Sequence, residues 1–133
     1  MTMDSSFQKE NGKRIAICSF KNRVSPRFDL THEILIFDLD NSGNPVEVIH
    51  TSFISPEERF NILAKRGIHT LIVGGMQPRF QEMFLNDQIE VIWGVIGEVK
   101  DVLQAYSKGT LYAGMGSIRD SRKGRERGHG SRR

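Results

Sequence analysis

Residues 12–40 read GKRIAICSFKNRVSPRFDLTHEILIFDLD, and this stretch decides how the rest of the sequence is interpreted. Two apolar runs, RIAICSF and HEILIFDLD, flank a basic segment that contains Pro26. Short apolar runs of this kind are typical of buried strands. The stretch therefore raises the question of whether the segment between the runs only joins two strands or also binds a ligand.

The sequence that follows predicts a third strand next to the second. NSGNP at 41–45 has the residue types of a turn, and VEVIHT at 46–51 alternates apolar and polar residues. Alternation of this kind indicates a strand with one buried face. We expect the second and third strands to form a hairpin, with the third strand at an edge of the sheet.

A helical pattern begins after this hairpin. Ser55 is a suitable N-cap, Pro56 suits the first helical position, and Glu58 completes a capping box. The helix is expected to continue through EERFNILAKR and to end at Gly67.

Two further strand–helix units follow. HTLIVGG at 69–75 and IEVIWG at 89–94 are the predicted strands, with helices starting at Pro78 and within 97–109. The order is βββ-α-β-α-β-α, and parallel pairs need such helical crossovers. We predict an α/β fold with a five-stranded mixed sheet in the order 3-2-1-4-5, with strand 2 antiparallel, and three helices.

The charge of the 133-residue chain is unevenly distributed. Residues 119–133 carry seven Lys or Arg and two acidic residues, a net charge of +5, whereas residues 1–118 have a net charge of −2. We expect a flexible N-terminus at 1–12, one domain at 13–112 and a basic disordered tail at 113–133. No apolar run reaches the roughly 18–20 residues that cross a membrane, and one cysteine suits a reducing compartment, so a cytoplasmic location without membrane contact is expected.

The predicted topology also indicates where a ligand would bind. In open α/β sheets, ligands bind beyond the carboxyl ends of the strands where the strand order reverses. Here that crevice lies between the first and fourth strands, beside loops 19–30, 74–78 and 93–97. Basic side chains and helix N-termini at this crevice favour an anion. The alternative is that its glycines only form turns and its basic residues are solvated.

The sequence gives no support to an enzyme. A nuclease with two metal ions needs carboxylates on the central strands, and RIAICSF has none. No nucleophile elbow or P-loop occurs. The histidines share no metal-ligand spacing; they are His32, His50, His69 and His129. We therefore expect a protein without catalytic residues.

A family resemblance adds to this interpretation. KRIAIC, RVSPRFDLTHEILIFDLD, LAKRGIHTLIVGGM and IEVIWGVIGEVKDVLQAYSKGTL, in this order, resemble the dinitrogenase iron–molybdenum cofactor biosynthesis domain. The likeness covers about residues 13–112. Its most specific parts are the Val-Ser-Pro-x-Phe motif at 24–28, the glycine pair at 74–75, and Gly109-x-Leu111 after the last helix. Where some relatives have His, this chain has Arg27, and positions that carry Cys in others correspond to Val73 and Ser117.

The resemblance implies a ribonuclease-H-like sheet and a non-enzymatic carrier or chaperone, related to nitrogen fixation, of iron–molybdenum or iron–sulfur clusters or their precursors. It also implies a protein partner in cofactor assembly. The cofactor-binding candidates for such an anionic cluster, or another small anion, are Ser25, Arg27, Phe28, Gly74, Gly75 and Met76. Cys18 is the candidate metal ligand, although a buried core position is the alternative, because free cysteine is often buried.

A second function remains open from the sequence. The tail RKGRERGHGSRR resembles arginine–glycine segments that contact nucleic acid by charge. The alternative to a cluster carrier is therefore a metal-free interaction protein whose basic tail contacts nucleic acid or a protein partner.

Overall fold

The computed structural model describes residues 13–39 and 43–117. The predicted flexible N-terminus at 1–12 lies outside the described residues, as does the predicted tail from residue 118 onward. No helix in the described part of the chain is long and apolar enough to cross a membrane.

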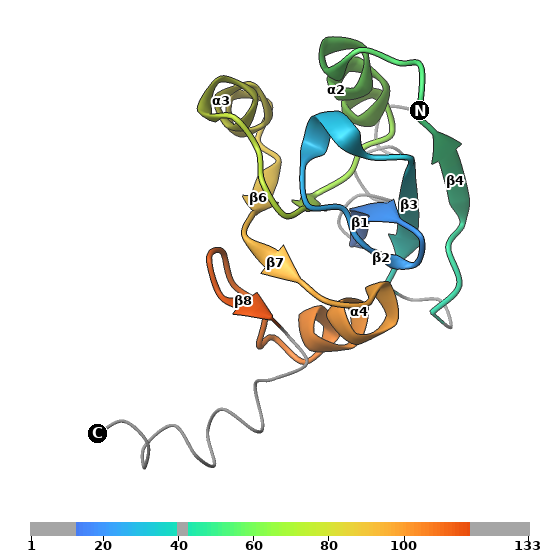
Figure 1. Ribbon diagram of the computed structural model, residues 1–133, viewed down its shortest axis with the longest axis vertical. Coiled ribbons are helices and arrows are strands. Elements are labelled where there is room, and N and C mark those ends of the chain that lie inside the picture. The colour runs from blue at the N-terminus through green and yellow to red at the C-terminus, as the bar shows by residue number, and fades with distance from the viewer. Residues whose placement is uncertain (1–12, 40–42, 118–133) are drawn as a thin grey trace, which may run out of the picture.

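The central sheet has the strand order that the sequence predicts (Figure 1). Its strands lie side by side in the order β4 (Glu47–His50), β3 (Glu33–Asp38), β1 (Arg14–Phe20), β5 (Thr70–Ile72) and β6 (Glu90–Ile92). β3 runs antiparallel to both of its neighbours, whereas the β1–β5 and β5–β6 pairs are parallel. The prediction of a mixed, ribonuclease-H-like sheet with an antiparallel second strand is confirmed, and β4 lies at one edge of the sheet.

Three α-helices cover the sheet and match the three predicted helices. They are α2 (Pro56–Lys65), α3 (Pro78–Asn86) and α4 (Val99–Ser107). α2 and α3 pack on one face of the sheet and α4 on the other (Figure 1). A short 3-10 helix, η1 (Phe28–Leu30), follows the basic segment that joins β1 to β3.

The middle strand β1 is buried on both faces, because successive side chains of a strand point to opposite sides. Ile15 and Ile17 belong to the apolar cluster on the α4 side. Ala16 and Cys18 belong to the cluster on the α2 and α3 side. Helices on both faces therefore explain why β1 is a continuous apolar run rather than an alternating one.

Helix α2 begins and ends where the sequence predicts. The Ser55 hydroxyl accepts a hydrogen bond from the Glu58 backbone N–H at 3.2 Å, and Pro56 occupies the first turn. Gly67 follows the helix with a φ of 68°, a left-handed conformation that glycine adopts without strain.

The structure contains three short strands that the sequence did not separate from their neighbours. They are β2 (Arg23–Val24), β7 (Val95–Ile96) and β8 (Gly116–Ser117). β2 folds back on β1 through Lys21 and Asn22, which have φ values of 53° and 68°. β8 lies beyond residue 112, where the disordered tail was expected to start, so paired backbone extends to Ser117.

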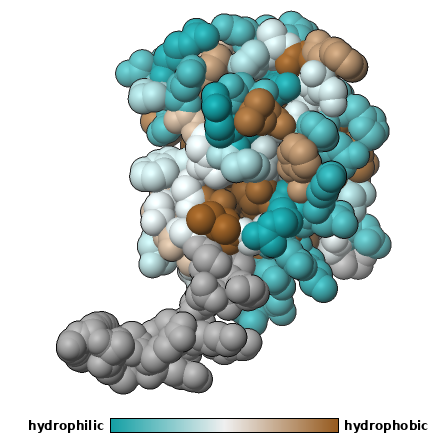
Figure 2. Space-filling view, in the orientation of Figure 1, coloured by the Kyte–Doolittle hydropathy of each residue, from teal (hydrophilic) through white to brown (hydrophobic). Residues whose placement is uncertain are grey.

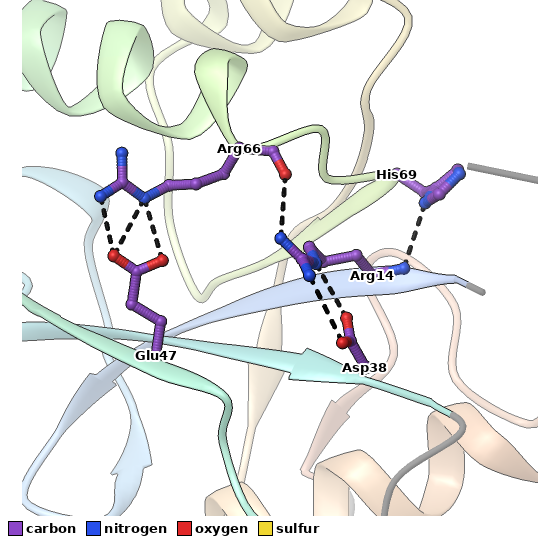
Figure 3. A network of polar contacts seen from close by, with 5 residues as sticks. All are labelled: Arg14, Asp38, Glu47, Arg66 and His69. Carbon is purple, nitrogen blue, oxygen red and sulfur yellow. Dashed lines mark hydrogen bonds and ion pairs between the residues drawn. The ribbon is translucent and has the colours of Figure 1, made fainter. Parts of the chain in front are cut away.

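A polar network joins the elements at the amino end of β1 (Figure 3). The Arg14 side chain donates to Asp38 at 2.8 Å, and its backbone N–H donates to His69 Nδ1 at 3.1 Å. Arg66 donates to Glu47 at 2.7 Å. These contacts close the end of the sheet opposite to the predicted ligand crevice.

Candidate functional site

The predicted crevice lies at the carboxyl ends of β1 and β5, and backbone hydrogen bonds bridge it. Gly74 N donates to Ser25 O at 2.9 Å, and Gly75 N donates to Pro26 O at 2.6 Å. Phe28 N donates in turn to Gly75 O at 2.8 Å. We call these three bonds the backbone clamp. Because the clamp occupies the N–H groups of both glycines, these groups do not face a ligand.

The same contacts explain why residue 74 is glycine. An ideal Cβ at Gly74 would lie 2.7 Å from Ser25 O and 2.8 Å from Pro26 Cα. Real Cβ atoms do not approach backbone atoms this closely, so a larger residue requires the loop to move. The close approach at Gly74 is therefore one of backbone to backbone, and it is made by the loop of residues 25–28.

A cavity of about 300 Å³ opens beside the clamp. It is lined by Arg27, Phe28, Asp29, Gly75, Met76, Gln77 and Phe80. Four of the six cofactor-binding candidates thus lie together at one cavity. The other two do not line it: Gly74 is held within the clamp, and Ser25 is fully buried, with its hydroxyl donating to Arg27 O at 2.8 Å.

Arg27 supplies positive charge at this cavity. Its side chain is 56% exposed, and its Nη2 and Nε lie 2.7 Å and 3.1 Å from the carboxylate oxygens of Asp29. Helix α3 starts at the same cavity, because its N-cap Gln77 and its residue Phe80 are both lining residues. The positive end of the α3 dipole therefore adds to the charge of Arg27.

Met76 supplies the soft donor of this cavity. Its thioether side chain is half-buried and packs against the apolar core under α2 and α3. Its carbonyl accepts a hydrogen bond from the Gln81 side chain at 2.9 Å, which fixes the loop before α3. The cavity thus combines the Arg27 guanidinium and its carboxylate partner Asp29 with one helix N-terminus and one thioether.

Cys18, the candidate metal ligand, does not line this cavity. Its side chain is fully buried in the cluster beneath α2 and α3. Burial raises the pKa of the Cys18 thiol to about 12, against the opposing effects of a hydrogen bond from Thr31 and the charge of Arg59. Its role as a ligand stays a prediction, and burial opposes it because the thiolate is the metal-binding form.

Arg59 is a residue of this region that the sequence did not single out. It is only 4% exposed, and it donates to Phe28 O at 2.5 Å and to Thr51 O at 2.7 Å. Its Nε is buried without a hydrogen-bond partner among the described residues. The buried Arg59 side chain therefore holds the loop that carries Phe28 through its hydrogen bond to the Phe28 carbonyl. The sequence contains one indication that Arg59 faces the core: it lies four residues before the buried Leu63, on the same face of α2.

The structure also contains a larger groove on the other side of the sheet. It measures about 950 Å³ and lies between α4 and β3, with Leu35 and Leu103 among its lining residues. None of the candidate residues from the sequence lines it. We therefore place the candidate site at the smaller cavity, where charge and a soft donor coincide.

The described residues do not build a metal centre of protein ligands. Across 13–39 and 43–117, no three His, Cys, Asp or Glu side chains are close enough together to hold a metal ion.

Comparison with known sequences identifies the family. The sequence model described as "Dinitrogenase iron-molybdenum cofactor" matches residues 12–109. The chain belongs to this family. The match includes every candidate site residue, from Cys18 to Met76. No curated protein matches the chain.

Solved structures share the fold of this family member. A protein named PH0822 is 25% identical, with a TM-score of 0.66, and the match covers 77% of this chain and 95% of that one. The apo form of the orange protein from Desulfovibrio gigas is 21% identical, with a TM-score of 0.63, covering 78% of this chain and 94% of that one. At 21% identity, the second likeness shows the fold alone.

Proposed function

We propose that the chain carries an anionic iron–molybdenum or iron–sulfur cluster, or a precursor of one, at the cavity beside Arg27 and Met76. Family membership indicates cofactor handling. The observation that supports this location is the meeting of Arg27, Met76 and the start of α3 at one cavity. A sulfide-rich anion is attracted by the positive charge and accepts contact with a thioether.

Arg27 is available for such an anion despite its ion pair. The pair with Asp29 is more than one-third exposed on both side chains. Exposed pairs of this kind contribute only about 0.2–1 kcal/mol. An anionic ligand therefore replaces Asp29 as the partner of Arg27 at small cost.

The buried position of Cys18 favours a role in transferring preformed clusters over a role in assembling them. Iron–sulfur clusters are normally held by several cysteine thiolates. With its single thiol buried in the core, the chain is suited to accept a preformed cluster and hold it by charge. Such binding is reversible, which fits a non-enzymatic carrier that receives its cargo from one protein of cofactor assembly and releases it to another.

Anaerobic titration of the chain with a preformed iron–molybdenum–sulfur cluster tests this function, with absorbance and metal analysis as the readout. Arg27→Ala removes a charge-assisted contact, and we expect binding about 10- to 100-fold weaker. Lys65→Ala is the matched control, because Lys65 is an exposed cation on α2 that does not line the cavity. Its affinity should equal that of the wild type.

The Cys18→Ala variant distinguishes binding by charge at the cavity from binding through the Cys18 thiolate. We expect unchanged affinity, since the thiol is buried away from the cavity. A loss of binding with an unchanged unfolding midpoint would instead make Cys18 a ligand. Absence of binding by the wild-type chain, or equal binding by Arg27→Ala, would reject the proposed site.

A further inference from the structure

Two ion pairs of exposed side chains lie next to the cavity beside Arg27, and each pair is neutral as a whole. Arg27 is bound to Asp29 at 2.7 Å. The guanidinium carbon of Arg79 lies 4.2 Å from the ring centre of the lining residue Phe80, and Arg79 is bound to Glu57 at 3.0 Å. The start of α3 adds only a partial positive charge. A full net charge at this cavity therefore needs another source.

Arg59 is a buried cation in this region without a carboxylate partner. Within residues 13–39 and 43–117, no Asp or Glu lies within ion-pair distance of it. Its guanidinium donates instead to two neutral carbonyls, those of Phe28 and Thr51, and its Nε has no hydrogen-bond partner in this part of the chain. Because Arg59 is only 4% exposed, water screens this charge weakly.

An unpaired charge in the core has an energetic cost. Moving a charged group out of water is unfavourable unless a partner compensates it. Burial accordingly lowers the pKa of Arg59 below its ordinary value of 12.5, with smaller, opposing effects from Cys18 and Asp29. A guanidinium nevertheless stays protonated at neutral pH. The folded protein therefore keeps a full positive charge at this position.

Arg59 lies close enough to the cavity for its charge to act there. Its guanidinium carbon is 6.0 Å from the ring centre of Phe28, and Phe28 lines the cavity. Charges attract each other more strongly through protein than through water, since the effective dielectric constant is about 20 rather than about 80. Hydrophilic and apolar side chains share the outer surface over η1 and α2, where a charged ligand can approach from solvent (Figure 2).

We propose that Arg59 is a specificity-determining residue that gives the cavity its preference for anions. It acts through its charge, from behind Phe28, and does not touch the ligand. This inference rests on the proposed function, because the anion that it concerns is the cluster bound beside Arg27. An anion that replaces Asp29 on Arg27 gains the attraction of a second, unpaired guanidinium in the core. A neutral ligand gains no such attraction, and a cation is repelled.

Anaerobic titration with the preformed iron–molybdenum–sulfur cluster tests this role, with absorbance and metal analysis as the readout. Arg59→Met removes the charge and retains an unbranched side chain. We expect binding about 10-fold weaker, the order expected when one unit charge acts across the width of a side chain. Arg59→Lys keeps the charge and should bind within a fewfold of the wild type.

A double-variant cycle separates the charge of Arg59 from its support of the loop. If Arg59 acted only by holding the loop that carries Arg27, Arg59→Met would have no further effect once Arg27 is replaced. Because its charge acts directly on the ligand, we expect the same loss of about 10-fold in the Arg27→Ala background. Unfolding midpoints show whether each variant is folded. Arg59→Gln keeps an amide donor for one carbonyl and replaces Arg59→Met if that variant does not fold.

Arg66→Met is the matched control, because Arg66 follows the other end of α2 and does not line the cavity. It should bind like the wild type. Absence of binding by the wild type would reject the proposed function and this role with it. If the wild type binds and Arg27→Ala weakens binding, three results would overturn the Arg59 inference alone. They are unchanged binding by Arg59→Met, no further loss in the Arg27→Ala background, and binding by Arg59→Lys as weak as that of Arg59→Met with an unchanged unfolding midpoint.

Discussion

At the scale of single residues, Gly74 allows two segments distant in sequence to approach closely. Its N–H donates to Ser25 O, and its missing side chain leaves room for the backbone of Ser25 and Pro26. The neighbouring Gly75 is less restricted, since an ideal Cβ there meets Pro26 O at 3.1 Å. The two glycines therefore differ in how much a side chain would disturb the clamp.

Replacing Gly74 by alanine should destabilise the protein by about 1–3 kcal/mol, the usual cost of forcing an extra group into a packed site. Gly75→Ala should cost clearly less. Urea denaturation followed by circular dichroism measures both variants against the wild type. Equal midpoints for the two variants would show that the loop of residues 25–28 moves freely, against the close contacts at Gly74.

At the scale of elements, an ion pair joins the edge strand β4 to the end of helix α2 (Figure 3). Arg66 donates to both carboxylate oxygens of Glu47, at 2.7 Å and 3.1 Å. These hydrogen bonds hold the pKa of Glu47 below its ordinary value of 4.5. The pair is the polar attachment between β4 and α2, next to the apolar packing of Ile49.

This lowered pKa predicts how the pair contributes to stability as pH changes. A carboxylate with a lowered pKa in the folded state contributes stability above its unfolded pKa and loses it as pH falls through the folded value. Because Glu47 is about one-third exposed, we expect only about 0.5–1 kcal/mol near pH 7. Glu47→Gln should lose this amount at pH 7 and match the wild type well below pH 4.5.

Denaturation at a series of pH values measures this difference. Glu82→Gln is the control, since Glu82 is an exposed carboxylate of α3 with no ion pair among the described residues. It controls for the loss of one exposed carboxylate. A gap at Glu47→Gln that persists at a pH where the Glu47 carboxyl is protonated in both the folded and the unfolded state would assign the effect to something other than the carboxylate charge.

Elements with a long periodic pattern were predictable, and short ones were not. β1 and β3 are continuous apolar runs, and α2 has a side-chain cap. The local sequence of each element is therefore enough to predict its secondary structure. β2 has two residues, and its turn uses Lys21 and Asn22 in left-handed conformations without a glycine. Pairing with β1, contacts with β7 and the start of α4, and the burial of Val24 hold it in place, and none of these is visible in the sequence.

At the scale of the whole molecule, the crevice between β1 and β5 was predictable from topology, but the residues that line its cavity were not. The crevice between β1 and β5 follows from the strand order. Contacts between residues far apart in the sequence, such as the clamp between loop 25–28 and Gly75, decide which candidate residues line the cavity. Cys18 is a core residue because the register of β1 turns it toward α2 and α3, which periodicity alone leaves open.

The burial of Cys18 in the central strand predicts that its reactivity reports unfolding of the whole domain. The thiol is fully buried with a pKa of about 12, so a thiol reagent at pH 8 should modify it about 1000-fold or more slowly than a free cysteine. Mass spectrometry after timed labelling measures the rate, with full modification expected in denaturant. A Cys18→Ala, Ser52→Cys variant places the thiol at an exposed position and should react at once. Rapid labelling of the folded wild type would show a local route to Cys18.

The backbone clamp has a further consequence for protein engineering. Three main-chain bonds hold residues 25–28 against the end of β5, and none of them involves the side chain of Arg27 or Met76. The framework of the cavity and the chemistry of its lining are therefore separable. Under the proposed function, Arg27→His or Met76→Cys should change which ligands bind at the cavity while the loop keeps its path, so one scaffold could be fitted with different ligand sets.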